Sequence, residues 1–457
     1  MGKRLALVAV AAASAGVLVL AGVRPLPAAD AGTALAEVQQ AAKAAHDRGD
    51  PAAYRTEIER FMILTSGHPE TVFAMGKAEA LLGHPAAAMD WLRSFADMGL
   101  VRDLAAEPDL ASLRQDPGMP ALLALIAGNR QAVSRSQPAF TLSDPNLLTE
   151  DLAFDPIRRR FLVSSIREAK VVAIDARTGA VADFVPAGRD AIWGVMALAV
   201  DARRGVLWAT TAALAAFPGY TPAAAGHTAV LRYDLATGKL QKRYDLPMPA
   251  ASQPSAGAAA APTASAAAEA DRDRVLGDMT VSPAGDVFVS EAVTGAVYTI
   301  RRERDVLETL VPPGTFASPQ TPAVTPDGRR LLVADYVRGI GVVDLASRAV
   351  IWMEHPRGVA VNGIDGMYLA GASLIAVQNG TEPNRVVRFR LDPGLRRILG
   401  WEPLDSNSPG LGAPTHGTLA GNDFYFLANS GWDQLADDGS VKPDGKLTPA
   451  SVRRVTL

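Results

Sequence analysis

The sequence predicts an all-β six-bladed β-propeller preceded by an all-α domain. The main observation is a strand pattern, closed by a tight turn, that recurs six times between residues 136 and 457. The turns begin at Asp155, Asp201, Ser282, Thr325, Ala370 and Gly421, in steps of 46, 81, 43, 45 and 51 residues. A period of about 40–50 residues with four strands per unit is typical of a propeller. Residues 32–131 show apolar positions at helical spacing instead.

Residues 1–31 are expected to form a secretory signal peptide. Lys3 and Arg4 precede an apolar run over residues 5–23, and the Ala-Asp-Ala sequence at 29–31 fits an A-x-A cleavage site. We therefore expect an exported protein, periplasmic or secreted. If the signal is not cleaved, the apolar run is long enough to anchor the protein in a membrane.

Residues 32–131 are expected to form the helical domain. Glycine and proline residues that end or start helices stand at Gly49, Pro51, Pro69, Gly83 and Gly99. Residues 68–92 resemble a tetratricopeptide repeat, with small residues at Ala78 and Ala88 where paired helices pack closely. The resemblance implies a surface for a protein partner. The alternative is a small helical bundle that serves as a spacer. On either interpretation we expect a role in contacting a partner or in packing, and no chemistry.

Each repeat of the propeller region contains a recognisable second and third strand. The second strand is rich in β-branched or aromatic residues, as in Phe161–Ser164 and Leu331–Ala334, which is typical of a strand buried on both faces. The third strand ends in an Asp-x-x-Thr-Gly turn at residues 175–179 and 234–238. In such a turn the aspartate caps the backbone and glycine takes the left-handed conformation.

The last repeat lacks a fourth strand, because the chain ends soon after its third strand at residues 451–455. A strand-like segment at residues 139–142 precedes the first repeat. We expect this segment to supply the missing outer strand and to close the ring, which protects the sheet edges. Residues 249–274 are rich in Ala, Pro and Ser and are expected to form a low-complexity loop between the second and third blades.

The composition excludes several kinds of chemistry. The chain has no cysteine, so disulfides, thiolate metal sites and a cysteine nucleophile are excluded. The net charge of −3 comes without a basic stripe, which argues against nucleic acid as a partner. A G-x-S-x-G elbow, a glycine-rich phosphate loop and an H-E-x-x-H motif are all absent from the sequence.

Polar side chains from separate repeats are expected to meet on the propeller axis. The innermost strand of each blade begins near the channel, so residues four or five positions before each turn face it. Among these positions are Glu150, Asp278, Gln320, Thr321, Asp365 and His416. Carboxylates this close repel one another unless a cation or proton intervenes, and oxygen ligands suit Ca²⁺. Alternatively, Asp278 and Asp365 cap strand-entry turns, and Glu150 pairs with an arginine.

Four of these segments resemble the family of gluconolactonase, regucalcin (senescence marker protein) and luciferin-regenerating enzyme. The segments are residues 150–155, 277–283, 320–328 and 365–367, and the resemblance spans about residues 147–430. It implies a six-bladed propeller with a divalent metal ion in the channel. It also implies the opening of sugar lactones by metal-assisted attack of water.

The resemblance implies a metal site formed by Glu150, Asp365, Asp278 and Gln320. Glu150 and Asp365 match the family's metal-binding glutamate and aspartate, and Asp365 also matches its presumed catalytic base. Asp278 matches the acidic member of an Asn-Asp pair, in which Gly277 here replaces the asparagine. Gln320 stands where the family has a metal-binding asparagine.

Two functional hypotheses follow. The first is a lactone or ester hydrolase that uses Ca²⁺, with Mn²⁺ or Zn²⁺ as alternatives, and Asp365 as the base. Further channel candidates on the substrate side are Asn362, Thr321 and His416. Val275 replaces the family's substrate-contacting arginine, which argues against sugar-lactone specificity. The second hypothesis is a non-catalytic protein that binds a small ligand in the channel or a protein partner through residues 32–131.

Overall fold

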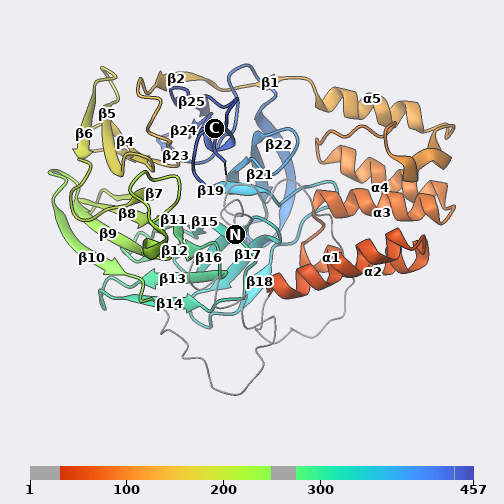
Figure 1. Ribbon diagram of the computed structural model, residues 1–457, viewed down its shortest axis with the longest axis horizontal. Helices are drawn as coiled ribbons and strands as arrows, with labels where there is room; N and C mark the ends of the chain where they lie inside the picture. Colours follow the sequence, from red (N-terminus) through yellow and green to blue (C-terminus); the bar gives the residue numbers. More distant parts are fainter. Residues whose placement is uncertain (1–30, 249–273, 437) are drawn as a thin grey trace.

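The computed structural model describes residues 31–248, 274–436 and 438–457, and shows a propeller with a helical domain at its side (Figure 1). The expected signal peptide and low-complexity loop therefore lie almost entirely outside the described residues. No helix in the described part of the chain combines the length and the hydropathy needed to cross a membrane.

The helical domain has the helices that the Gly and Pro positions predict, followed by a shorter segment. Its elements are α1 (Ala31–Asp47), α2 (Pro51–Leu64), α3 (Pro69–Leu81), α4 (Pro85–Asp97), the 3₁₀ helix η2 (Pro108–Leu113) and α5 (Met119–Asn129). Proline suits the first turn of a helix because its missing N–H has no helical partner there. Gly83 and Gly99 follow α3 and α4 with φ of 75°, a left-handed conformation that favours glycine. The sequence analysis does not predict α5.

Six antiparallel sheets are arranged as blades in the described residues, which confirms the predicted fold class. Blade 1 contains β3 (Leu152–Asp155), β4 (Arg160–Ser165), β5 (Lys170–Asp175) and β6 (Val181–Val185). Blade 2 contains β7 (Gly194–Asp201), β8 (Val206–Ala212), β9 (Thr228–Asp234) and β10 (Leu240–Asp245). Blade 3 contains β11 (Leu276–Val281), β12 (Val287–Glu291), β13 (Ala296–Ile300) and β14 (Leu307–Val311). Blade 4 contains β15 (Pro319–Val324), β16 (Arg330–Asp335), β17 (Gly339–Asp344) and β18 (Val350–Trp352). Blade 5 contains β19 (Ile364–Ala370), β20 (Ser373–Gln378), β21 (Arg385–Leu391) and β22 (Ile398–Ser406). Blade 6 contains β23 (Gly417–Ala420), β24 (Asp423–Leu427) and β25 (Ser451–Thr456). In each blade the strand that comes first in this order is the innermost.

The ring is closed as the sequence predicts. Strand β2 (Gln137–Thr141) pairs antiparallel with β25, so that Phe140 lies opposite Val452 in the sixth blade. The two-residue strand β1 (Val133–Ser134) pairs with β22 and adds a fifth strand to blade 5. The connection from the helical domain therefore runs along the outer edges of two neighbouring blades. The sequence analysis does not predict β1.

The helical domain is packed against blades 4 and 5. The guanidinium of Arg385, at 1% exposure, donates from Nη1 to the carbonyl oxygen of Met98 at 2.6 Å. Asn362 donates from Nδ2 to the carbonyl oxygen of Thr65 at 2.9 Å. A buried donor without its acceptor costs about 1–3 kcal/mol, and more when charged, so these bonds tie the two parts together. The packing role expected as an alternative for the helices is therefore present in the structure.

Candidate metal centre

The innermost strands bring four titratable side chains to the propeller axis. Glu150 lies two residues before β3, Asp278 lies in β11, Asp365 is the second residue of β19, and His416 immediately precedes β23. All four are buried, with exposures of 6% or 7% for Glu150 and Asp365 and 4% or less for the other two. These side chains come from blades 1, 3, 5 and 6, so only closure of the ring brings them together.

Three of these residues form a group with the dimensions of a metal site. Glu150, Asp365 and His416 each offer a ligand atom, and these atoms lie within 4.8 Å of one another. Two carboxylates and an imidazole are ligands that divalent cations accept in proteins. The sequence analysis names Glu150 and Asp365 as ligands, but places His416 only among the channel candidates.

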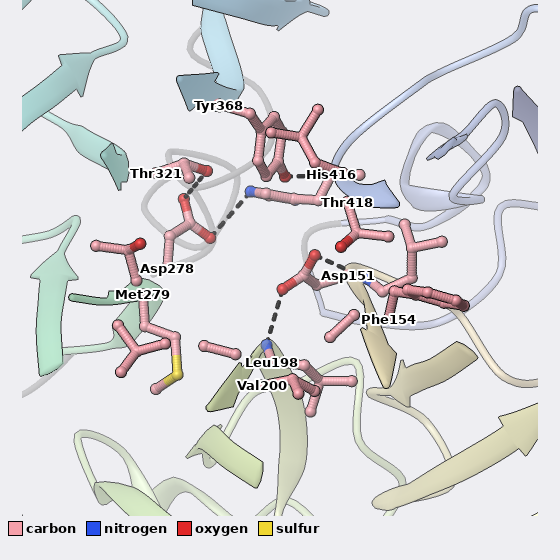
Figure 2. Close-up of a pocket in the computed structure, with 17 residues that line it drawn as sticks. Asp151, Phe154, Leu198, Val200, Asp278, Met279, Thr321, Tyr368, His416 and Thr418 are labelled. Carbon is pink, nitrogen blue, oxygen red and sulfur yellow. Dashed lines mark hydrogen bonds and ion pairs between the residues drawn. The ribbon is translucent and has the colours of Figure 1, made fainter. Parts of the chain in front are cut away.

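The other two expected ligands make different contacts. Oδ1 of Asp278 lies 3.0 Å from Nε2 of His416, and Oδ2 of Asp278 lies 3.3 Å from Oγ1 of Thr321 (Figure 2). Gln320 is buried and donates from Nε2 to Oγ of Ser318 at 3.0 Å. Metal ligation by Asp278 and Gln320 stays a prediction.

The imidazole of His416 has one satisfied nitrogen and one without a hydrogen bond. Nδ1 lies 3.1 Å from the carbonyl oxygen of Glu150 and can donate to it. Nε2 is buried, and its contact with Oδ1 of Asp278 lacks the alignment of a hydrogen bond. Oδ1 of Asp365 is 4.0 Å from the same nitrogen. A buried ring nitrogen that faces carboxylates must carry a proton or bind a cation, so these residues can hold a metal ion that displaces this proton.

A fourth carboxylate, Asp151, lies beside the group and was missed by sequence reasoning. It is 6% exposed, and its Oδ2 accepts the backbone N–H of Leu198 in blade 2 at 2.7 Å. Among the residues that the structure describes, no Lys or Arg forms an ion pair with Glu150, Asp151, Asp278 or Asp365. The arginine pairing considered for Glu150 is therefore not found there, and the excess negative charge favours a cation.

The electrostatics of the group follow from burial and from this excess of negative charge. Burial, with a contribution from Asp365, raises the pKa of Glu150 to about 8. Burial raises the pKa of Asp365 to about 6 and that of Asp151 to about 7. Burial alone would lower the pKa of His416, but the charges of Asp278 and Asp365 outweigh it and leave that pKa well above its ordinary value. The metal-free group therefore holds protons at neutral pH.

Cation affinity is expected to rise with pH between about 6 and 8. A divalent cation must displace the proton of Glu150 and a proton of His416, and both groups hold their protons more tightly than usual. Each displaced proton changes the affinity by about tenfold per pH unit, with weaker binding at lower pH. Titration calorimetry with Ca²⁺ and Mn²⁺ at pH 6, 7 and 8 measures this slope. An affinity that is constant over this range would contradict proton displacement.

Hydrogen bonds hold Asp365 in a fixed orientation. Nδ2 of Asn379 donates to Oδ2 of Asp365 at 2.6 Å and to the carbonyl oxygen of Pro414 at 3.0 Å. The hydroxyl of Tyr336 donates to Oδ1 of Asn379 at 3.0 Å. Oδ1 of Asp365 takes no part in this series of hydrogen bonds and remains available for a ligand. Asn379 and Tyr336 follow the second strands of blades 5 and 4, outside the column of residues that the sequence analysis considers.

The two remaining channel candidates differ in position. Oγ1 of Thr321 donates to the carbonyl oxygen of Asp365 at 2.9 Å and lies between Asp278 and Asp365. Asn362 lies under the helical domain, where Nδ2 donates to the carbonyl oxygens of Thr65 and Val337. The structure therefore places Thr321 at the acidic group and Asn362 at the junction between the domains.

An axial cavity of about 220 Å³ adjoins the acidic group. Its polar lining includes Asp151, Asp278, Thr321 and His416, which Figure 2 shows pointing toward one another across the axis. Its other walls come from the innermost strands and are largely apolar. The molecule thus presents a buried acid–histidine group beside a cavity that is large enough for several waters or a small organic molecule.

The molecule belongs to the class of six-bladed propellers with a buried Glu/Asp/His group. No protein-family model matches the chain, and no curated protein matches it in sequence. Its structure is similar to that of a luciferin-regenerating enzyme, at 13% identity and a TM-score of 0.45, over 72% of this chain and 96% of the other. It is also similar to virginiamycin B lyase from Staphylococcus aureus, at 15% identity and a TM-score of 0.45, over 70% and 99%. A calcium-binding protein, regucalcin, from Agrobacterium tumefaciens matches at 13% identity and a TM-score of 0.44, over 69% and 93%.

Proposed function

We propose that this protein is a divalent-cation-dependent hydrolase of lactones or related esters. The observation that carries the proposal is the convergence of Glu150, Asp365 and His416 within 4.8 Å, buried and without a described Lys or Arg partner. Carboxylate ligands favour Ca²⁺, whereas the imidazole extends the choice to Mn²⁺ and Zn²⁺. The N-terminal signal pattern adds the proposal that the protein acts outside the cytoplasm, which fractionation of cells that express the full chain would test.

The residues of the site suit this chemistry. A bound divalent cation would act as a Lewis acid toward the carbonyl oxygen of the substrate. Asp365 is held through Oδ2 by Asn379, which leaves Oδ1 to accept a proton from a water molecule. Burial raises the pKa of Asp365 to about 6 without a metal ion, and a bound cation would favour its ionised form, which a general base requires. The same group can then return the proton to the leaving oxygen.

Lactone hydrolysis should require both the cation and Asp365. We expect purified protein with Ca²⁺, Mn²⁺ or Zn²⁺ to hydrolyse members of a lactone panel, and a chelator to stop the reaction. Asp365→Ala is expected to lower kcat by about 10²–10⁴-fold, the range for loss of a general base. Asp327→Ala, which removes an aspartate from a surface turn, is the matched control and should keep full activity. Full activity of Asp365→Ala would remove Asp365 from the mechanism.

A second candidate function is binding without catalysis. The site is buried, and its cavity of about 220 Å³ is smaller than the roughly 300–1,000 Å³ of typical ligand sites. This limited space for an organic substrate supports the second candidate function. A protein partner on the exposed faces of α1–α5 belongs to this alternative. Cation binding without hydrolysis of any lactone, together with capture of one partner that is lost when exposed helix residues are substituted, would favour it.

A further inference from the structure

At the end of the axial cavity where the innermost strands begin, apolar side chains of four blades are packed together. Leu148, Met196, Leu214, Val275 and Leu435 pack into one buried cluster above the acidic group. These residues come from the strand starts and from loops of blades 1, 2, 3 and 6. Burial of such a cluster excludes water from this end of the cavity on the side of blades 1, 2, 3 and 6.

The connection between β24 and β25 contacts this apolar cluster and helps to hold it in place. The indole N–H of Trp432 donates to the carboxylate of Glu150, and Leu435 inserts into the apolar cluster. Gly439 of the same connection lies so close to blade 2 that a Cβ atom there would sit 2.2 Å from the carbonyl oxygen of Ala215. The connection therefore spans from blade 6 to blade 2 in close contact.

The opposite end, where the innermost strands reach their turns, is more open. In the innermost strands of all six blades, half-buried residues appear only toward the turn, at positions such as Phe154, Val200, Thr280, Val324 and Thr418. Four of these five, all except Val324, line the axial cavity. The half-buried residues of the innermost strands thus lie nearer the turns than the acidic group does.

The charged side chains that line the cavity are mostly acidic. Asp151, Asp278 and His416 lie at its inner end, and none of the described lining residues is Lys or Arg. Carboxylates accept hydrogen bonds and repel anions, and a low-dielectric wall strengthens both effects.

We propose that ions and substrates reach the Glu150–Asp365–His416 site from the turn face of the propeller, and that the acidic inner end admits small neutral or cationic molecules with hydrogen-bond donors in preference to anions. This inference rests on the proposed function for the reaction itself and assigns its substrate class. The preferred substrates are uncharged hydroxyl-bearing esters, and sugar acids or phosphates are disfavoured to the extent that the carboxylates outweigh the charge of the bound cation.

The absence of cysteine allows a direct test. Thr321→Cys places one thiol at the inner end of the cavity, and Ala346→Cys places one on an exposed turn as the reference. In chelator, each variant reacts with a methanethiosulfonate that carries either a trimethylammonium or a sulfonate group. The thiolate attacks the sulfenyl sulfur, methanesulfinate leaves, and a mixed disulfide forms. Mass spectrometry gives the rates.

Two results are expected at Thr321→Cys. The ratio of the cationic reagent's rate to the anionic reagent's rate should be larger at Thr321→Cys than at Ala346→Cys, by on the order of tenfold or more. Addition of Thr418→Trp, at the turn end of the cavity, should slow labelling by about tenfold. Val441→Trp, on the β24–β25 connection, is the matched control and should leave the rate unchanged.

Other outcomes overturn the inference. Slowing by Val441→Trp but not by Thr418→Trp would place the passage at the strand-start end. Equal normalised rates for the two reagents would remove the charge selection, and an unreactive thiol in folded protein would show a closed cavity. If Thr321→Cys does not fold, Ala153→Cys, at a buried position that lines the same cavity, replaces it. Because labelling is done in chelator, a protein that labels as expected but binds no cation would refute the proposed function and leave the route intact.

Discussion

Deletion of residues 136–145 is expected to lower the melting temperature by on the order of 10 °C or more. The deletion removes β2, the strand that closes blade 6, and exposes the edge of β25. It also removes Leu142, which is 1% exposed, and Phe140, whose ring centroid lies 5.1 Å from that of Phe161 in blade 1. Loss of a buried leucine alone costs about 2–5 kcal/mol.

The same deletion removes a buried polar contact. Nε of Arg453 donates to Oγ of Ser136 at 2.7 Å and lies 3.3 Å from Oδ2 of Asp405 in blade 5. A replacement of residues 136–145 by a Gly-Ser linker of equal length separates loss of the strand from shortening of the chain. Differential scanning calorimetry of both variants gives the result. A melting temperature that matches the unmodified protein would show that β2 does not close the ring.

Substitution of Glu150 and Asp365, the two proposed carboxylate ligands, by their amides is expected to change cation affinity and stability in different directions. Glu150→Gln or Asp365→Asn should weaken Ca²⁺ and Mn²⁺ binding on the order of a hundredfold or more, because each removes an anionic ligand from a three-residue group. Both amides keep the shape of the side chain. The amide oxygen can still accept from Trp432 at position 150 and from Asn379 at position 365.

The metal-free Glu150→Gln protein should melt at a higher temperature than the unmodified protein at pH 8. Glu150 has an ordinary pKa of 4.5 that burial raises to about 8 in the folded state. A carboxyl group whose pKa is raised by folding binds more protons when folded, so its effect on the free energy of unfolding becomes less favourable as pH rises from about 4.5 to 8. Glutamine does not ionise, so the difference between the two proteins should vanish near pH 4.

Asp335→Asn is the matched control for a buried carboxylate outside the site. Asp335 is fully buried and accepts backbone N–H bonds from Ala317, Val337 and Arg338 at 2.6–3.0 Å. Its amide would place an NH₂ group against these donors, so the melting temperature should fall while cation affinity stays unchanged. If Glu150→Gln behaved like Asp335→Asn, with lower stability and normal affinity, Glu150 would be a structural residue only.

The fold could be predicted because its signals are local. Blades 1 and 2 carry nearly the same turn at residues 175–179 and 234–238, where Oδ1 of Asp175 accepts the N–H of Thr178 at 2.7 Å and Oδ1 of Asp234 accepts that of Thr237 at 2.8 Å. The missing fourth strand of the last repeat pointed to β2 as its replacement. Strand β1 has only two residues and is fixed by its pairing with β22, so no pattern in the sequence reveals it. Helix α5 was missed although Pro120 stands in its first turn.

The site could be predicted only as far as the repeat fixes the register. Glu150, Asp278 and Asp365 stand at equivalent positions of their blades, and counting back from the turns finds them. Asp151 follows Glu150 directly, but its carboxylate reaches Leu198 of another blade, which one repeat does not show. Asn379 and Trp432 reach the group from connections between strands, whose course depends on tertiary packing. The adjacent Glu150-Asp151 pair at a channel position was the available signal for the fourth carboxylate.

Elemental analysis by plasma mass spectrometry tests the central claim, that Glu150, Asp365 and His416 share one cation. The protein is dialysed against Ca²⁺ or Mn²⁺, desalted and compared with a Glu150→Gln/Asp365→Asn variant treated in parallel. We expect one equivalent of metal in the unmodified protein, its removal by a chelator, and none in the variant. Absence of bound metal from the unmodified protein, or equal metal in both, would contradict the claim.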